Sequence, residues 1–533
     1  MSAFARLRRV AARTLGRGGG ERRLVAQAFD RAWYLTTNPD VAATRADPLD
    51  HFLAHGWREG RDPTPRFSVD EYLENNPDIA AAGLNPFVHW LKHGRHEGRP
   101  TPDALGFRQQ VIRRLKPIDE QVDASSRATA AVAAGTAAAL AAGLGKARHG
   151  LKGLHITFSH DDYRTKVGGV QLCLHIEAAR VAGQRRDHLQ LHPAIHWPVV
   201  RAAGDPGRLE AVLNGQSLGV FAPADVAEAL AKARVAGGSF AIHSLLGHEA
   251  GETAAIVEAA GLKAGFLWLH DYASLCAGFH LLRDGVEDCA APPPESGACA
   301  ICVHGPARAR HIDAHAALFE RLDLTVVSPA RGTLDFWRAH TGLKPAASVV
   351  HPHAALTPRG PAPAPKAGPL RVAYAGHPAA HKGWPIFRDL SLRHEGDRRY
   401  TFLHLGASTE AGLPMQFHDV RVSAEKPHAM REALERLEVD VLVFWPLWRE
   451  TFSFLACEAV AAGAAILTGP DSGNVAALVR GYDAGRIVSE AELADAFATG
   501  TVAELSRAAR RPMLYDLAFS GMTADLVPAK VPA

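Results

Sequence analysis

The sequence predicts an α/β protein with two doubly wound, Rossmann-like lobes that face a cleft, preceded by a small α-helical repeat module. From about Leu151, short β-type runs alternate with helical stretches, and the same alternation resumes after a Pro-rich segment at 357–369. Strand–helix alternation on both sides of a linker is typical of two parallel sheets covered by helices. Upstream, residues 29–104 repeat with a period of 38, which predicts a pair of stacked helical units.

These features divide the whole chain. In order they are a basic tail (1–28), the two repeats (29–104), a helix and Ala-rich linker (105–150), a first lobe (151–356) with a Cys-rich insertion (276–302), a Pro-rich hinge (357–369), a second lobe (370–495), and a C-terminal helix and tail (496–533). Ligands of doubly wound folds bind at the carboxyl ends of the strands, so the cleft between the lobes is the expected site.

Composition excludes several classes of protein. Of the 533 residues, 47% are hydrophobic and 22% are charged, which excludes global disorder. A net charge of +3 argues against a dedicated nucleic-acid binder. No apolar signal core stands in Met1–Gly20, and Ala128–Gly145 is too rich in Ala and Gly to favour a membrane span, so we expect a cytoplasmic protein.

The two repeat units, 29–66 and 67–104, align without a gap. Each carries an Asn-Pro-Asp triplet, in which Pro should end one short helix and start the next. Gly56 and Gly94 are expected as helix C-caps. We interpret the repeated aromatic residues as the core of the module, and recognition of a protein partner remains the alternative. The Arg-rich tail carries Phe4, Leu7 and Val10 at helical spacing. It is either a solvated segment or a helix that makes peripheral contact with a membrane.

The most informative segment is Val439–Gly473. A buried-type strand is followed by a loop with Glu450 and by a helix that contains Glu458, eight residues further on. Two carboxylates placed in this way can accept hydrogen bonds from the hydroxyls of a sugar or ribose. The N-terminus of the same helix offers free N–H groups to a phosphate.

Glu450 and Glu458 form the E-x(7)-E motif of retaining GT-B glycosyltransferases, and the chain resembles family 4 of that class. The flanking sequence from Pro446 to Gly463, P-x-x-x-E-T-F-x-x-x-x-x-E-A-x-A-x-G, matches the family as closely as the two glutamates do. The resemblance implies that Glu458 binds the ribose hydroxyls and that Glu450 acts in catalysis by orienting the donor sugar. Gly473, in the turn after the next strand, is also expected at the donor site.

A second motif opens the predicted second lobe. Residues 371–383 read RVAYAGHPAAHKG, similar to the G-R-x-x-x-x-K-G element whose basic residues neutralise the donor diphosphate. Gly376 and Lys382 match, but His377 stands where the family has Arg. The permanently charged Arg, which can donate two hydrogen bonds to a phosphate, is thus replaced by a histidine that is neutral or only partly charged near neutral pH. How the diphosphate is held, or which nucleotide-sugar is used, therefore stays open.

The first lobe carries weaker similarities. Gly168 and Gly169 resemble the glycines of the G-G-V loop that approaches donor phosphate and acceptor. His270, at the end of a predicted strand, resembles the histidine that reaches the donor sugar and is expected to be catalytic, although a purely structural histidine is the alternative. The resemblance covers roughly residues 151–490. It also implies a terminal helix at about 501–518 that crosses back onto the first lobe.

The resemblance implies transfer of a sugar from a nucleotide-sugar donor, UDP- or GDP-linked, to a saccharide or lipid-linked acceptor with retention of configuration. Bacterial cell-surface or exopolysaccharide synthesis is the expected setting, in the cytoplasm or peripherally at the inner face of its membrane. No cofactor for catalysis is implied, because Lys382 and helix N-termini would carry the charge of the leaving group. The alternatives are another GT-B enzyme, such as a nucleotide-sugar epimerase, and a degenerate scaffold that acts as a binding protein.

Four of the six cysteines follow C-x(12)-C-x(9)-C-x(2)-C inside a Pro-rich insertion. Four thiolates in a polar, irregular loop suit a closed tetrahedral zinc site with a structural role. Unligated or paired thiols and an iron–sulfur site are the alternatives. The candidate ligands are Cys276, Cys289, Cys299 and Cys302, with His304 and His311 as substitutes.

Overall fold

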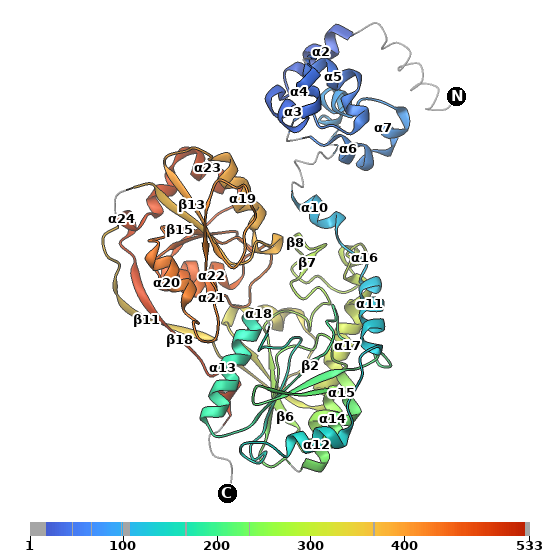
Figure 1. Ribbon diagram of the computed structural model, residues 1–533, viewed down its shortest axis with the longest axis vertical. Helices are drawn as coiled ribbons and strands as arrows, with labels where there is room; N and C mark the ends of the chain where they lie inside the picture. Colours follow the sequence, from blue (N-terminus) through green and yellow to red (C-terminus); the bar gives the residue numbers. More distant parts are fainter. Residues whose placement is uncertain are drawn as a thin grey trace. The chain divides into compact units, whose positions relative to one another are not determined.

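The computed structural model describes residues 18–44, 46–64, 67–97, 99, 107–165, 168–233, 235–365 and 368–527. The described residues fall into two compact units, one within Met1–Arg114 and the other within Leu115–Ala533 (Figure 1). The apolar positions Phe4, Leu7 and Val10 of the basic tail lie outside the described residues. None of the helices in the described part is both long and apolar enough to span a membrane.

The first unit contains the two predicted repeats. Helix α2 (Gly18–Ala26) precedes them and packs on both, so the end of the predicted tail belongs to this unit. The first repeat forms α3 (Arg31–Thr37), α4 (Pro39–Thr44), α5 (Pro48–Ala54) and the 3-10 helix η2 (Gly56–Glu59). The second forms α6 (Val69–Asn75), α7 (Pro77–Ala82), α8 (Pro86–His89) and the π-turn η3 (Trp90–Gly94). As predicted, Pro39 and Pro77 each open a new helix.

The predicted C-cap role of Gly56 and Gly94 is wrong. Gly56 begins η2 and Gly94 ends η3, and neither has a left-handed backbone. A Cβ atom on Gly56 would overlap the hydroxyl of Tyr34, and one on Gly94 would overlap that of Tyr72. Each tyrosine is fully buried and bonds to a histidine of its own repeat, His51 (3.1 Å) or His89 (2.9 Å). Each position therefore requires glycine, because a buried tyrosine hydroxyl occupies the space that a Cβ atom would fill.

The same ion pair closes each repeat. Arg61 binds Asp40 through two hydrogen bonds of 2.8 Å, and Arg99 binds Asp78 through two of 2.9 Å. Each guanidinium also reaches the Asn side chain of the same triplet, at 3.0 and 2.9 Å respectively. The Asn-Pro-Asp and Glu-Gly-Arg sequences recur because they meet in space.

The first lobe of the second unit has one mixed sheet in the order β10-β9-β6-β5-β1-β2-β3-β4. β2, β3 and β4 pair antiparallel and the other neighbours pair parallel. The strands are β1 (His155–Phe158), β2 (His188–Pro193), β3 (Leu209–Leu213), β4 (Gln216–Phe221), β5 (Ser239–Ile242), β6 (Ala264–Trp268), β9 (Asp323–Ser328) and β10 (Ala347–Val350). The helices are α13 (Gly169–Gly183), α14 (Pro223–Ala233), α15 (Ala250–Ala259), α17 (Gly305–Arg321) and α18 (Arg331–His340).

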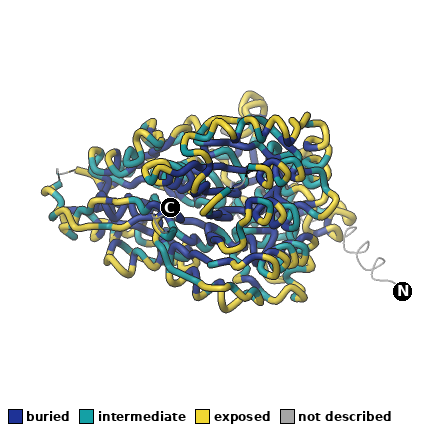
Figure 2. Tube along the Cα trace, turned by 90° about the horizontal axis from the view of Figure 1, so that it is seen from below, coloured by how far each residue is buried: buried dark blue, intermediate teal, exposed yellow. Residues whose placement is uncertain are grey.

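The second lobe, orange in Figure 1, has a wholly parallel sheet in the order β14-β13-β12-β15-β16-β17. Its strands are β12 (Leu370–Ala375), β13 (Tyr400–Gly406), β14 (Gln416–Asp419), β15 (Val441–Val443), β16 (Ala465–Thr468) and β17 (Gly485–Ile487). The helices are η4 (Ala380–Lys382), α19 (Trp384–Arg393), α20 (Ala429–Arg436), α21 (Phe454–Ala461), α22 (Asn474–Tyr482) and α23 (Glu490–Thr499). The central strands of both sheets are buried. Figure 2 shows buried residues, in dark blue, inside the molecule and exposed ones on its outside. The two helix-covered sheets confirm the predicted fold class, although β3 and β4 make the sheet of the first lobe mixed and not wholly parallel as expected.

The Ala-rich segment predicted as a linker is part of the first lobe. After α10 (Phe107–Arg113), the chain forms α11 (Ile118–Ala130) and α12 (Ala137–Leu144). Leu140 and Leu144 are buried in the core of the first lobe. The small alanine side chains let α12 approach α14 closely, and the lobe therefore begins well before residue 151.

The C-terminal helix predicted at 501–518 is also wrong. The chain instead forms η5 (Thr501–Leu505), α24 (Arg507–Arg510), β18 (Met513–Phe519) and α25 (Thr523–Leu526). Pro512 disfavours helix at the residue before it, where Arg511 takes φ 49°. β18 pairs antiparallel with β11 (Ala354–Pro361), so the first part of the predicted hinge is an edge strand. The return to the first lobe is confirmed, since Gln184, the residue that follows α13, donates to the carbonyl of Ala524 (2.8 Å).

Candidate functional site

A cavity of about 600 Å³ lies between the two lobes of the second unit. The predicted residues that line it are Gly168, Gly169, Gly376, His377, Lys382, Glu450 and Glu458. A larger groove of about 840 Å³ follows α13 and residues 519–527, but its charged groups, Arg180 and Asp525, pair with each other at 3.1 Å. The interlobe cavity is therefore the candidate site, because most of the predicted site residues line it.

Lys382 and Glu450 form an ion pair at the wall of this cavity. The Lys382 ammonium donates to Glu450 Oε1 at 2.7 Å and lies 5.0 Å from the centre of the Trp448 ring. Glu450 is buried and Lys382 is about one-third exposed. Burial raises the pKa of Glu450, and the nearby ammonium opposes that shift.

The Lys-Gly sequence of the second motif has a local explanation. Gly383 ends η4 with φ 80°, a left-handed conformation that favours glycine. A Cβ atom at this position would also overlap the carbonyl oxygen of Trp445. Gly376, with φ 109°, turns the chain out of β12 toward His377, which is exposed and whose Nδ1 lies 3.3 Å from the Ser408 hydroxyl.

Glu458 lies inside α21 and is 5% exposed. Burial raises the pKa of its carboxyl to about 8, while interactions with Arg431 act in the opposite direction. The helix begins at a capping residue, Ser453, whose hydroxyl accepts from the amide of Ala456 at 3.2 Å. The first residues of α21 line the cavity, so its N-terminal amides point toward the same space as the two glutamates.

Gly473 does not line the cavity. It has φ 60°, and a Cβ atom there would overlap the backbone nitrogen and oxygen of Glu450. The next residue, Asn474, donates from its amide to the Glu450 carbonyl at 2.8 Å. Gly473 therefore positions the loop of Glu450.

Thr451, the middle residue of the E-T-F sequence, links the lobes. Its hydroxyl donates to the carbonyl oxygen of His270 at 2.7 Å, and its own carbonyl accepts from the Thr333 hydroxyl at 2.9 Å. Both partners belong to the first lobe. The Thr of this motif thus holds the loop of Glu450 against the opposite lobe.

The His270 side chain is buried next to the cavity and does not line it. Its Nε2 lies 2.9 Å from His243 Nδ1, and its ring lies between those of Trp268 and His353, with centroids 5.5 and 5.0 Å away. Burial, helped by the nearby His353, lowers its pKa well below the ordinary histidine value. Ligand atoms of Cys173, His270 and His353 all lie within 4.8 Å of one another, so these buried residues could also hold a metal ion.

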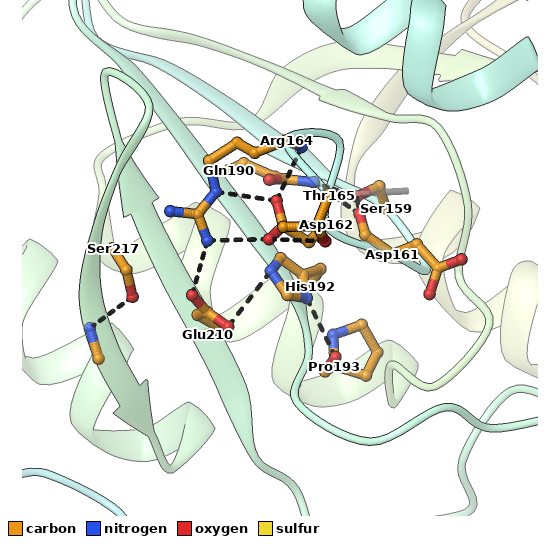
Figure 3. Close-up of polar contacts among 11 residues, drawn as sticks. Ser159, Asp161, Asp162, Arg164, Thr165, Gln190, His192, Pro193, Glu210 and Ser217 are labelled. Carbon is orange, nitrogen blue, oxygen red and sulfur yellow. Dashed lines mark hydrogen bonds and ion pairs between the residues drawn. The ribbon is translucent and has the colours of Figure 1, made fainter. Parts of the chain in front are cut away.

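The first-lobe wall was missed by sequence reasoning. Arg164 lines the cavity, and its guanidinium is held by Asp162 through bonds of 2.9 Å and by Glu210 at 2.8 Å (Figure 3). Ligand atoms of Asp162, His192 and Glu210 lie within 4.8 Å of one another, but Arg164 already supplies positive charge there. Asp162 and Arg164 closely follow β1, and this place at the carboxyl end of a strand is the signal that could have identified them.

The four cysteines of the insertion line one small cavity of about 20 Å³. His304 and Arg308 line it too, and Arg308 Nη1 lies 2.7 Å from Cys299 Sγ. His311, the other substitute ligand considered, lies elsewhere: its Nε2 accepts from the amide of Val200 at 3.0 Å. The four cysteines thus line a common cavity, but among the described residues no three of their sulfurs lie within 4.8 Å of one another, and His311 is not part of this lining.

Comparison with known proteins gives only distant likenesses. No family model matches the sequence, and no curated protein matches it. Among solved structures, a sucrose-phosphate synthase from Thermosynechococcus elongatus is 13% identical over 67% of this chain and 92% of its own, with a TM-score of 0.42. Anabaena HepE in complex with UDP-glucose is 14% identical over 70% and 97%, with a TM-score of 0.41. A UDP-forming α,α-trehalose-phosphate synthase from Burkholderia vietnamiensis is 14% identical over 68% and 94%, with a TM-score of 0.37. Identities this low do not transfer a substrate to this chain.

Proposed function

We propose that this chain is a retaining glycosyltransferase that binds a nucleotide-sugar donor in the interlobe cavity. The observation that carries the proposal is the meeting of three residues from two separate motifs at one wall. Lys382 and Glu450 form a partly buried ion pair there, and Glu458 is a buried carboxylate on the adjoining helix. Buried ionisable groups with shifted pKa values in a cavity are typical of functional sites.

The donor is proposed to bind with its diphosphate at Lys382 and the first amides of α21. Glu458 would accept hydrogen bonds from the ribose hydroxyls, and Glu450 would orient the sugar. His377 is exposed at the same cavity and would reach the phosphates only as a secondary contact. His270 would touch the sugar only after its side chain leaves His243, so we assign it a weaker role than the resemblance implies.

The reaction breaks the bond between the sugar's anomeric carbon and the diphosphate oxygen and forms one to an acceptor hydroxyl on the same face. The hydroxyl proton passes to the departing phosphate oxygen, while Lys382 stabilises the developing charge. The proposal needs no metal for catalysis. We propose that the donor is a UDP- or GDP-sugar, that the acceptor is a saccharide or is lipid-linked, and that the product belongs to cell-surface polysaccharide. Arg164 and its neighbours would form the wall of the cavity that faces the acceptor.

A thermal-shift screen of the full chain with UDP-, GDP-, ADP- and dTDP-sugars, without added metal, tests donor binding. A ligand that binds only the folded state raises the melting temperature, so one responding nucleotide class is expected. The responding donor is then incubated with saccharide acceptors, and NMR of the product reports its anomeric configuration. An inverted product would contradict retention, and an epimerised donor would favour the epimerase alternative. No response from a folded protein would favour the scaffold alternative.

A further inference from the structure

The segment between β6 and α17, residues 269–304, has little regular structure of its own. Its described elements are β7 (Leu282–Arg283), β8 (Glu287–Asp288) and α16 (Gly297–Ala300), each of four residues or fewer. Ile301 is 73% exposed. Elements this short are not stable alone. Leu275, Leu281 and Ala291 pack into the core of the first lobe, but none of residues 292–304 is buried, so apolar packing does little to hold that part of the segment.

The cysteines of this segment converge. Cys276, Cys289, Cys299 and Cys302 all line the same cavity of about 20 Å³, whereas Cys173 and Cys457 lie on α13 and α21. The Cys299–Cys302 turn is tightly built, with the Cys302 amide donating to the Cys299 carbonyl at 3.3 Å. Four thiols gathered from an irregular loop are typical of a structural zinc site.

A buried positive charge accompanies the sulfurs. Arg308 is 5% exposed, its Nη1 lies 2.7 Å from Cys299 Sγ, and its Nε donates to the Leu275 carbonyl at 3.2 Å. A zinc ion with four thiolate ligands has a net charge of −2, and a guanidinium donating to one of the sulfurs stabilises that charge. A neutral thiol accepts a hydrogen bond only weakly, so a thiolate is the better partner for this guanidinium.

We propose that Cys276, Cys289, Cys299 and Cys302 bind one zinc ion that orders residues 269–304. Among the described residues, no three of these four sulfurs lie within 4.8 Å of one another. In a tetrahedral site with Zn–S bonds of about 2.3 Å, the sulfur–sulfur distances are shorter than that. Zinc binding therefore requires the segment to contract, which its short elements allow. His304 Nδ1, buried at the same cavity without a hydrogen-bond partner, is the substitute ligand.

The zinc site would act on the second lobe through two side chains of the segment, Asp288 and His280. Asp288, next to Cys289, accepts from Arg449 at 2.6 Å. The ring of His280 lies 4.4 Å from that of Trp448 and stacks at 5.2 Å on His381, centre to centre. Arg449 and His381 directly precede Glu450 and Lys382 in the chain, so ordering the segment also supports the loops that carry the ion pair.

Metal analysis of the purified full chain tests the proposal independently of any transferase activity. One zinc per chain is expected by mass spectrometry of the metals. Cys299→Ser and Cys302→Ser should lower the zinc content at least fivefold, while the matched controls Cys173→Ala and Cys457→Ala should retain it. Replacement of zinc by Co²⁺ should give the intense visible absorption of a tetrahedral thiolate site.

A titration of the wild-type chain covers the case in which the cysteine variants do not fold. A mercurial reagent should release one zinc for every four thiols that react, and limited proteolysis should then cut within residues 269–304. A zinc-free folded chain whose four cysteines react as free thiols would overturn the proposal. Disulfides among them, or iron with sulfide in place of zinc, would overturn it equally.

Discussion

The two lobes of the second unit use buried charge in opposite ways. In the first lobe, Glu177 of α13 is fully buried and its carboxylate has three polar partners. These are His155 Nε2 at 2.5 Å, the Thr523 amide at 3.1 Å and His243 Nε2 at 3.4 Å. In the second lobe, Glu450 pairs with Lys382, which is about one-third exposed, and the interactions of Glu458 with Arg431 do not outweigh the effect of burial on its pKa. Both lobes are Rossmann-like, so the fold alone does not explain this difference.

The pKa values follow the same division. Burial acts to raise the pKa of Glu177, but the imidazoles of His243 and His155 outweigh it and hold that pKa well below the ordinary value. Burial prevails at Glu458 and raises its pKa to about 8. A satisfied carboxylate stabilises the protein, whereas a poorly satisfied one is ready for a ligand that donates hydrogen bonds. The comparison predicts four outcomes.

The largest effect is expected for Glu177→Ala. It removes the carboxylate that joins β1, β5 and the C-terminal segment, and breaking a buried ionic cluster in this way costs about 3–5 kcal/mol. The melting temperature should fall on the order of 10 °C. Glu450→Ala, the matched control in the second lobe, should change it far less. Similar losses in both variants, measured by scanning calorimetry, would remove the distinction between the lobes.

The next effect is on turnover. Glu450→Gln should leave donor affinity within a few-fold but lower kcat on the order of a hundredfold, because a misplaced donor sugar reacts slowly. Initial rates with the donor that responds in the thermal-shift screen provide the measurement. Glu432→Gln, which alters an exposed carboxylate of α20, is the control. Unchanged kcat in Glu450→Gln would reject its role in orienting the sugar.

A third prediction concerns pH and Glu458. Its folded pKa is raised to about 8, so its contribution to the stability of the unliganded protein is present below the ordinary Glu pKa and is lost as pH rises toward 8. Ribose hydroxyls bind the ionised carboxylate, so nucleotide affinity should rise with pH up to about 8, by at most about tenfold per unit. Titration calorimetry at several pH values measures the slope. The slope should vanish in Glu458→Gln, and a wild-type affinity independent of pH would contradict the assignment.

The smallest effect is expected where the lobes meet. Thr333→Val keeps the shape of the side chain but loses its hydrogen bond to the Thr451 carbonyl, which costs about 1 kcal/mol. A decrease of a few degrees in melting temperature is expected. A decrease as large as that of Glu177→Ala would mean that the interlobe contact, and not the core of the first lobe, limits stability.

The sequence alone determined the features that depend on near neighbours in the chain. The repeats, the helix breaks at Pro39 and Pro77, the parallel second lobe and the loop–helix placement of Glu450 and Glu458 all follow from local patterns of residues. Hydrophobic periodicity and proline chemistry act over a few residues, so they can be recognised without the fold.

Only the tertiary structure decided the features that depend on distant residues. Met513–Phe519 is a strand because it pairs with 354–361, far away in the chain. His270 is buried because His243 and His353 surround it, and Gly473 supports Glu450 because two loops meet there. Burial and long-range strand pairing depend on which segments come together in the fold. The residue pattern within a single segment does not determine its distant neighbours.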